Sequence, residues 1–407
     1  MADQDSANDG ATPPALLEMR SAAAAAIDRI ANELRDISLD IHSHPELNFQ
    51  EHRAHGLLTD YLERKGFRVE RGAYEMATAF EAVAGSGGPT IAVLSEYDAL
   101  PGIGHACGHN LIAISGVATA IALKEALGEG NGTVVLLGSP AEEGGGGKVF
   151  MTERGAFEGV DAAMMLHPAP GDAVWFSANA IQSLKLEFFG KNAHAAGSPW
   201  EGVNALDAMI SSFNNVSLLR QQMRPTDRVH GVILEGGLKP NIIPDHTVAE
   251  WYIRAVTVSE LHALKPRVVA CFEGAAKAAG CTMEITWTGR EYADVLTNDT
   301  LGERYVEHFR GLGGQVPAKG QPGFGGFSTD MGNVSYAVPS IHPMFRIPVT
   351  PGAGNHTPGF TACAATDEAH AASFRASKAL AMTALDLYAN PDVLAAAKAE
   401  FARVTVK

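Results

Sequence analysis

A cysteine and a histidine two positions apart, Cys107 and His109, are the first residues whose types and spacing could bind a metal ion. The small Gly108 between them allows a tight turn. A thiolate and an imidazole together suit Zn²⁺ or a neighbouring first-row metal. An isolated pair of this kind is more often a buried structural cysteine beside a core histidine. The pair therefore indicates a metal site only if further ligands accompany it.

Two adjacent carboxylates, Glu142 and Glu143, follow the apolar run 133–139 and precede four glycines. Adjacent acidic residues usually form a solvated turn. At the carboxyl end of a buried strand, however, successive side chains diverge, so one carboxylate can bind a metal while the other faces a water molecule. A carboxylate in such a half-buried position can serve as the general base for that water.

Two further histidines stand at the ends of segments of the kind that form binding sites. His167 follows the apolar run 162–166, and His356 lies in the glycine-rich stretch 352–357. Each alone is also compatible with an ordinary loop residue. Together with the residues above they give one thiolate, three imidazoles and two carboxylates. That set is sufficient for two metal ions and a general base.

Another histidine pair, His42 and His44, precedes a predicted helix and has no acidic or cysteine companion at a useful spacing. We therefore interpret these two histidines as residues that lead into the helix and serve packing, rather than as metal ligands.

The elements that must position these residues alternate in type along the chain. Helical patterns cover residues 15–39, 51–65, 111–127 and 367–388, and short apolar runs that indicate strands cover residues 90–95 and 133–139. This alternation predicts an α/β domain with a mainly parallel sheet flanked by helices. The candidate ligands follow the ends of strands, where open α/β sheets place their sites.

The pattern changes between residues 181 and 294. The order there is strand, helix, strand, strand, helix, strand, over residues 181–189, 202–222, 229–234, 247–255, 259–279 and 282–287. This order predicts a ferredoxin-like α+β domain. We therefore expect residues 1–180 and 295–407 to form one catalytic, metal-binding domain, into which residues 181–294 are inserted.

The composition argues against several classes of protein. A formal charge of −15 is not that of a general nucleic-acid binder. No stretch approaches the roughly 18 uninterrupted apolar residues that a membrane helix needs. Residues 1–14 are polar and acidic and lack the regions of a secretory signal. Four cysteines without disulfide-framework spacing fit a reducing compartment. We expect a cytoplasmic protein without nucleic-acid or membrane partners.

Several segments, in matching order, resemble the dinuclear-metal amidohydrolase and carboxypeptidase family of aminoacylase, carboxypeptidase G and hippurate hydrolase. The segments are His44-Pro45-Glu46-Leu47, Asp98-Ala99-Leu100-Pro101, His105-Ala106-Cys107-Gly108-His109, Pro140-Ala141-Glu142-Glu143, Ala193-His194-Ala195-Ala196 and Asn241-x-Ile243-Pro244. Residues 102–111 and 328–333 are similar to one branch of the family. That branch contains p-aminobenzoyl-glutamate hydrolase and related dipeptidases that act on basic residues.

The resemblance implies two divalent metal ions per subunit, Mn²⁺ or Zn²⁺, with Co²⁺ or Ni²⁺ as further candidates. The implied ligands are Cys107, which would lie between the ions, and His109, Glu143, His167 and His356. Glu142 would be the general base, and Asp98 would support the site from beneath. Glu96 stands where other members carry the histidine of a His-x-Asp motif, and its contact with metal is left open. Asn110 stands where many relatives carry aspartate, which removes a negative charge.

The resemblance also implies that the inserted domain is a lid and a dimer interface. His194 would reach into the active site of a partner subunit and hydrogen-bond the developing oxyanion. Asn241 and Arg254 would hold a substrate carboxylate, for which the planar guanidinium is well suited. From its strand position alone, Arg254 could equally be a packed ion-pair partner. A homodimer or a higher homo-oligomer is expected.

The predicted function is therefore hydrolysis, by water that the metals activate, of the amide C–N bond of an N-acyl or aroyl amino acid or a dipeptide-like carboxylate. Two alternative functions are also compatible with these residues. The same site could deaminate an electron-poor aromatic amine such as a nitroanthranilate, or the chain could be a non-catalytic amide-binding paralogue.

Overall fold

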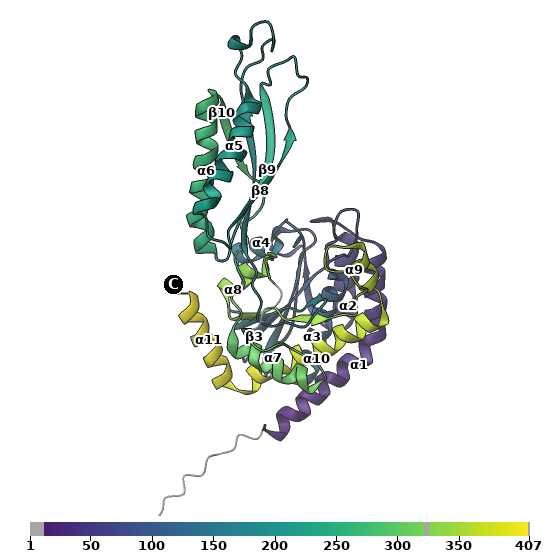
Figure 1. Ribbon diagram of the computed structural model, residues 1–407. Helices are drawn as coiled ribbons and strands as arrows, with labels where there is room; N and C mark the ends of the chain where they lie inside the picture. Colours follow the sequence, from purple (N-terminus) through teal and green to yellow (C-terminus); the bar gives the residue numbers. More distant parts are fainter. Residues whose placement is uncertain (1–11, 321–324, 406–407) are drawn as a thin grey trace, which may run out of the picture.

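The computed structural model describes residues 12–320 and 325–405. Figure 1 shows a broad body that contains both ends of the described chain, with a narrower lobe standing on it. The body and the lobe have separate hydrophobic cores. The boundaries at residues 181 and 294 stay a prediction, and the first strand of the lobe begins at Ala180. The N-terminal residues for which the sequence predicts no secretory signal lie largely outside the described part.

The body is built on a six-stranded sheet in the order β1-β2-β4-β3-β5-β11. Its strands are β1 (Arg68–Arg71), β2 (Phe80–Ser86), β3 (Thr90–Glu96), β4 (Gly132–Ser139), β5 (Ala162–Met164) and β11 (Ser340–Ile341). The four strands from β4 to β11 are parallel, and β1 and β2 extend one edge in antiparallel fashion. The predicted α/β class with a mainly parallel sheet is confirmed.

Helices cover the sheet, and three of them pack on one another: α1 (Pro14–Ser43), α3 (His109–Leu127) and α10 (Asp367–Ala389). Among the described residues, α3 is the one helix long and apolar enough to cross a membrane by length and composition, but most of it is buried inside the body. A helix that is apolar on all sides and enclosed by others is a core helix. The remaining body helices are α2 (His52–Arg64), η1 (Ala73–Glu75), α4 (Gly147–Glu153), α7 (Asp299–Gly311), α8 (Met331–Ala337), α9 (Pro358–Cys363) and α11 (Pro391–Thr405).

The lobe contains the predicted β-α-β-β-α-β order. Its main elements are β7 (Ala180–Phe189), α5 (Ala205–Leu219), β8 (Arg228–Glu235), β9 (His246–Ala255), α6 (Val258–Ala279) and β10 (Thr282–Trp287), with short turns η2 (Pro199–Glu201) and η3 (Arg220–Gln222). The antiparallel sheet has the order β10-β7-β9-β8. Side chains alternate between buried and half-buried along β7 and β9, because one face packs on α5 and α6.

A two-stranded parallel ribbon links the sheet to the surface of the body. It consists of β6 (His167–Ala169) and β12 (Met344–Arg346), with His167 opposite Met344 and Ala169 opposite Arg346. The carboxyl ends of β3 and β4 point to the same side as the start of this ribbon, so the segments after them converge at one edge of the sheet.

Candidate functional site

The five predicted metal ligands meet at this edge of the sheet and divide into two groups. Cys107, His109 and His167 offer ligand atoms that all lie within 4.8 Å of one another, and so do Cys107, Glu143 and His356. Cys107 belongs to both groups. This geometry suits two metal ions that share one thiolate, which is the position that the resemblance implies for Cys107.

The turn between Cys107 and His109 depends on the glycine between them. Gly108 has φ 77°, in the left-handed region, and a Cβ atom there would lie 2.6 Å from Cγ of Pro168. A side chain would therefore be strained and would collide with the segment that follows His167. Helix α3 begins at His109, so the imidazole is fixed to the first turn of the most deeply buried helix of the body.

Asp98 orients two of the candidate ligands at once. One carboxylate oxygen lies 3.1 Å from Nδ1 of His109, and the other accepts a hydrogen bond of 2.9 Å from the backbone N–H of Glu143. This leaves Nε2 of His109 facing the group of ligands. Asp98 thus contacts His109 and the backbone of Glu143 at once, in the arrangement of carboxylate and histidine that many metal sites use.

The other two histidines are also held through their neighbours. His167 has Nδ1 2.7 Å from the carbonyl oxygen of Pro168, so its Nε2 faces Sγ of Cys107 at 3.4 Å. His356 places Nε2 3.3 Å from an oxygen of Glu143. The backbone of His356 has φ 65°, which costs a residue with a side chain about 1–2 kcal/mol. A hydrogen bond from its N–H to the carbonyl of Ala106 holds this conformation.

Buried atoms without partners test whether metal ions fit here. Nε2 of His109, Oε1 of Glu143 and Oε1 of Glu96 have no hydrogen-bond partner among the described residues, although all three atoms are buried. Buried polar atoms are nearly always satisfied, so three such atoms in one cluster need an explanation. Cations bound by these groups would supply it, and we conclude that the site fits a pair of divalent ions.

The charges of the cluster support the same conclusion. Burial alone would raise the pKa of the Cys107 thiol, but the neighbouring imidazoles outweigh burial and hold that pKa well below its ordinary value. The nearby side chains of Cys107 and Glu143 raise the pKa of His356 to about 10. The imidazoles around Cys107 thus favour its thiolate, which is the form that binds a metal ion. Metal ions that bind these groups would replace the protons.

Glu142 lies beside the ligands rather than among the five. One of its oxygens is 3.9 Å from Nε2 of His109, and its backbone carbonyl accepts a hydrogen bond from Tyr292. Burial, followed by the charges of Glu96 and Glu143, raises the pKa of Glu142 well above its ordinary value. A raised pKa brings a carboxylate nearer to the range of an effective general base, and nearby divalent cations would oppose part of the rise.

A buried lysine, which the sequence analysis does not single out, completes the surroundings of Glu96. Nζ of Lys148 lies 2.5 Å from Glu96 and 2.8 Å from Asp330, and all three side chains are fully buried. The second oxygen of Glu96 is 3.3 Å from Nε2 of His109. Glu96 also forms a further group of possible metal ligands with His109 and Glu142. Glu96 is thus tied to Lys148 by one oxygen and faces the cluster with the other.

Asn110 and the first histidine pair serve the packing of the body. The amide of Asn110 donates hydrogen bonds to the hydroxyl of Ser38 and to the carbonyl of Ala364, away from both ligand groups. An aspartate at this position would therefore place its charge in this hydrogen-bonded setting, not on the candidate metal ligands. His42 lies 2.8 Å from the carbonyl of Thr361, and His44 lies against the end of α1.

A cavity of about 780 Å³ opens over the ligands, and Arg254 lines it. The guanidinium of Arg254 donates a hydrogen bond to Ser328 and forms no ion pair with any described carboxylate. Its position leaves it available for a ligand, so the ion-pair interpretation of Arg254 is not what the structure shows. Aromatic and apolar side chains form the rest of the wall, among them Tyr252, Phe327 and Met344.

His194 and Asn241 are not brought to this cavity. They lie next to each other, with the N–H of Ala195 donating to the carbonyl of Asn241, and both are exposed. The pairing of β7 with β9 places Ile181 opposite Arg254 at the cavity and Phe189 opposite His246 at the other end. Eight strand residues span roughly 27 Å. His194 follows that far end of β7, and Asn241 precedes the same end of β9.

The chain is similar to known proteins over most of its length. The model of the peptidase family M20/M25/M40 matches residues 92–374. The chain belongs to this family. The Xaa-Arg dipeptidase of Homo sapiens is 43% identical over 410 residues, which cover 95% of this chain and 92% of that protein. One of the subunits of p-aminobenzoyl-glutamate hydrolase from Escherichia coli (strain K12) is 36% identical over 299 residues, which cover 68% of this chain and 62% of that protein.

The M20 fold is also found among solved structures. A dinuclear metal binding peptidase of the M20 family from Bacillus subtilis superposes with a TM-score of 0.67 at 22% identity, over 89% of this chain and 99% of that one. The predicted resemblance is confirmed, and with it the expectation of a hydrolase that acts on amide bonds.

Proposed function

We propose that this M20 protein hydrolyses the amide bond of an N-acyl or aroyl amino acid, or of a dipeptide-like compound, that carries a free carboxylate. One observation carries the proposal: two ligand groups that share Cys107 lie in one cavity with Glu142 and an unpaired Arg254. The proposed metals are Mn²⁺ or Zn²⁺, with Co²⁺ or Ni²⁺ as further candidates. When bound, two divalent ions would polarise the amide carbonyl and lower the pKa of a water molecule.

The chain's own residues would perform the remaining steps. Glu142 would take a proton from the attacking water and pass it to the nitrogen of the leaving amine. Asp98 would keep the imidazole of His109 in its orientation throughout. Arg254 would donate two parallel hydrogen bonds to the substrate carboxylate.

The substrate proposal is supported by the relatives and by the wall of the cavity. One relative is named as a dipeptidase for Xaa-Arg and another as a hydrolase of p-aminobenzoyl-glutamate. Both names describe an amide beside a free carboxylate. In this chain the aromatic wall, with Tyr252 and Phe327, suits an apolar or aromatic acyl group. No feature of the cavity favours a nitroanthranilate, and the presence of Glu142 beside all five ligands argues against a non-catalytic role.

A substrate panel tests the proposal. Xaa-Arg dipeptides, p-aminobenzoyl-glutamate, N-acetylated amino acids and a nitroanthranilate would be incubated with protein loaded with Mn²⁺, Zn²⁺, Co²⁺ or Ni²⁺. We expect release of a free amino acid from at least one amide. Release of ammonia from the aromatic amine alone would establish deamination, and no reaction by fully metal-loaded protein would establish a binding protein.

Arg254→Gln is expected to lower kcat/KM by about 10- to 100-fold, the loss expected when hydrogen bonds to a charged group are removed. The loss should disappear for the same substrate with its carboxylate converted to a carboxamide. Arg290→Gln is the matched control, because Arg290 lines the same cavity but is paired with Glu153 at 3.3 Å. Equal losses in the two variants, or an equal loss with the carboxamide, would argue against Arg254 as the carboxylate ligand.

We also infer that the protein is a homodimer formed through the lobe. Strand β8 is an edge of the sheet, and it exposes apolar side chains such as Val232 (54% exposed) and Leu234 (57%), followed by Leu238 (87%). An exposed apolar edge strand is a template for pairing with another chain. A second copy at this edge would cover these residues. It would also bring the part of the lobe that carries His194 and Asn241 toward the partner's cavity, which His194 cannot reach in its own subunit in this conformation.

Mixed dimers test whether His194 acts across subunits. Glu142→Ala and His194→Ala should each lower activity strongly, the second by about 10²–10³-fold if His194 stabilises an oxyanion. After subunit exchange at equal concentrations, about a quarter of the wild-type sites should be intact, because half of the dimers are mixed and each has one complete site. Activity would be measured before and after exchange, with exchange confirmed by differently tagged chains. No recovery would mean that each site is complete within one chain.

The proposed compartment is the cytoplasm. The four cysteines, all in the described part, are free thiols, which suits a reducing compartment.

A further inference from the structure

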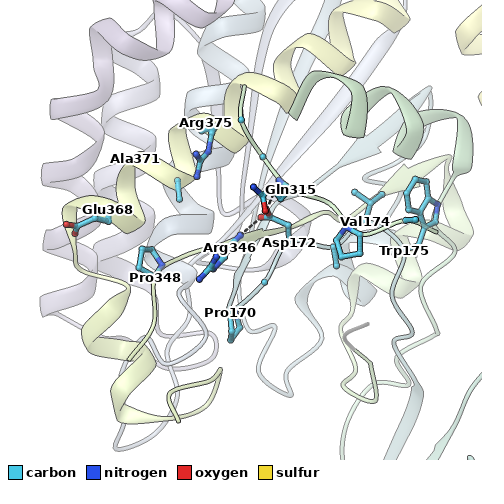
Figure 2. Close-up of a pocket in the computed structure, with 17 residues that line it drawn as sticks. Pro170, Asp172, Val174, Trp175, Gln315, Arg346, Pro348, Glu368, Ala371 and Arg375 are labelled. Atoms are coloured by element: carbon cyan, nitrogen blue, oxygen red, sulfur yellow. Dashed lines mark hydrogen bonds between the residues drawn. The ribbon is translucent and has the colours of Figure 1, made fainter. Parts of the chain in front are cut away.

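A second cavity of about 1150 Å³ lies on the body next to the candidate active site, and the function proposed above makes no use of it. Figure 2 shows its side chains. Helix α10 forms one side, the end of β12 another, and the loops after β6 and α7 the rest. Small residues form part of its lining, among them Ala371 and Ala372 on α10 and Gly313 and Gly314 after α7. We call it the Arg346–Arg375 pocket.

The two arginines of this pocket have no acidic partner. Among the described residues, neither guanidinium forms an ion pair or a hydrogen bond: Arg346 donates to Asp172 only through its backbone N–H, and the guanidinium of Arg375 lies 6.0 Å from the centre of the Phe309 ring. In Figure 2 the two side chains extend into the same space from β12 and from α10. Two cations that line one cavity repel each other, and an anion bound between them would relieve this repulsion. Their pairing is unusual in a chain with a formal charge of −15.

The carboxylates nearby do not neutralise these arginines. The oxygens of Asp172 accept hydrogen bonds from the backbone N–H groups of Gln315 (3.1 Å) and Arg346 (2.6 Å), so Asp172 fastens the walls of the pocket. Glu368 lies two helical turns before Arg375 on α10, which is about 10 Å along the axis. Figure 2 shows its carboxylate pointing away from both arginines.

A short ribbon connects this pocket with the candidate metal ligands. His167 and its neighbour Met344 stand at one end of the β6–β12 ribbon, at the active site, and Ala169 and Arg346 stand at the other end. Two residues of strand separate the ends, which is about 7 Å. The loop after β6 is fastened to the same ribbon, because Ala173 and Met344 exchange two backbone hydrogen bonds. A ligand bound by Arg346 would therefore contact β12, the strand that pairs with the candidate metal ligand His167.

We propose that the Arg346–Arg375 pocket is a second anion-binding site, for a small carboxylate- or phosphate-bearing molecule, and that its occupancy alters the active site through the β6–β12 ribbon. The guanidinium fork matches both kinds of anion, and two forks can hold one carboxylate or phosphate group from two sides. The ring of Trp175 forms part of the wall at the end of the cavity away from the two arginines.

Binding is tested on the metal-loaded protein, with thermal melting and calorimetric titration as readouts that need no activity. Succinate, inorganic phosphate and glycerol phosphate would be titrated separately at an ionic strength held constant with sodium chloride. We expect saturable binding of at least one of them, and the identity of that anion distinguishes a carboxylate from a phosphate ligand. Arg346→Gln combined with Arg375→Gln should weaken this binding at least ten-fold.

Two control variants test whether the anion binds at the Arg346–Arg375 pocket. Arg403→Gln removes an exposed arginine of α11 and should leave binding unchanged. Arg254→Gln removes the arginine of the active-site cavity and should also leave it unchanged. Binding that persists in the double variant, or is lost in Arg254→Gln, would overturn the assignment of the pocket. A response no greater than that to chloride at the same ionic strength would overturn it as well.

The coupling to the active site has its own measurement. Saturating anion should change kcat/KM of the wild-type protein by at least two-fold, and the double variant should show no change. Saturable binding without any change in kcat/KM would overturn the coupling.

Discussion

Replacing Glu142 with glutamine is expected to lower kcat by about 10²- to 10⁴-fold while both metal ions remain bound. The amide keeps the size of the carboxylate but cannot accept a proton from water. Because Glu142 belongs to neither of the two ligand groups that share Cys107, metal content should not fall. The measurements are kcat with a substrate identified in the panel and metal content by elemental analysis of the dialysed protein.

The neighbouring residue provides the control. Glu143→Gln changes one carboxylate in the same way at the next position, but Glu143 is in a ligand group with Cys107 and His356. We expect that variant to lose metal affinity as well as activity. If Glu142→Gln loses metal to the same extent, Glu142 is a ligand, as its grouping with Glu96 and His109 would allow. If it keeps nearly full turnover with metal bound, another group is the base.

The adjacent glutamates show why this part of the site could be predicted from the sequence. A buried strand ends at Ser139, and the turn that follows brings both carboxylates to the same edge of the sheet, each 3.9 Å from Nε2 of His109. Cys107 and His109 could be recognised for a similar reason, because the glycine between them permits the tight, left-handed turn that brings both side chains to one place. In the lobe, the order of strands and helices was sufficient for the fold, since few arrangements satisfy that order.

The parts that could not be predicted depend on contacts between distant residues. Lys148 follows four glycines, a setting that usually indicates an exposed turn. Only the folded chain shows that Gly147, where a Cβ atom would lie 1.9 Å from the carbonyl oxygen of Pro140, brings Lys148 into the interior. The distance of His194 from the cavity depends on the length and direction of the lobe. Arg346 and Arg375 come together only because β12 and α10 are neighbours in space.

Replacing Lys148 with methionine is expected to lower the free energy of unfolding by about 3–5 kcal/mol, the typical cost of removing one partner from a buried ion pair. The substitution leaves Glu96 and Asp330 buried without their cation. Urea unfolding would be followed by circular dichroism in the presence of a chelator, so that differences in metal binding do not enter. Lys378→Met is the matched control: its ammonium pairs with Asp28 at 2.6 Å at the surface, and its loss should cost less than about 1 kcal/mol.

The pH dependence of the stability lost in Lys148→Met identifies the cause of that loss. In the wild-type protein burial alone would raise the pKa of Glu96, but Lys148 and His109 hold it at about 2. Without Lys148, burial would raise the pKa of Glu96 in the folded state above its value in the unfolded chain, and it would raise further the pKa of Asp330, which burial already raises in the wild-type protein. A carboxylate with a raised folded pKa binds its proton more tightly in the folded state, so acid favours folding of the variant. The difference between wild type and Lys148→Met should therefore shrink as the pH falls from 7.5 to about 5.

A triple variant separates the loss of the cation from the loss of packing. Lys148→Met combined with Glu96→Gln and Asp330→Asn has neutral amides in place of the two carboxylates, and it should recover much of the stability lost by the single variant. If the single variant is as stable as wild type, or if its deficit does not change with pH, the two carboxylates are not held as anions by Lys148. Recovery of stability in the triple variant would show that Lys148 stabilises the two buried carboxylates, Glu96 and Asp330, as anions. Lys148 would then hold Glu96 in its position facing the candidate metal ligands.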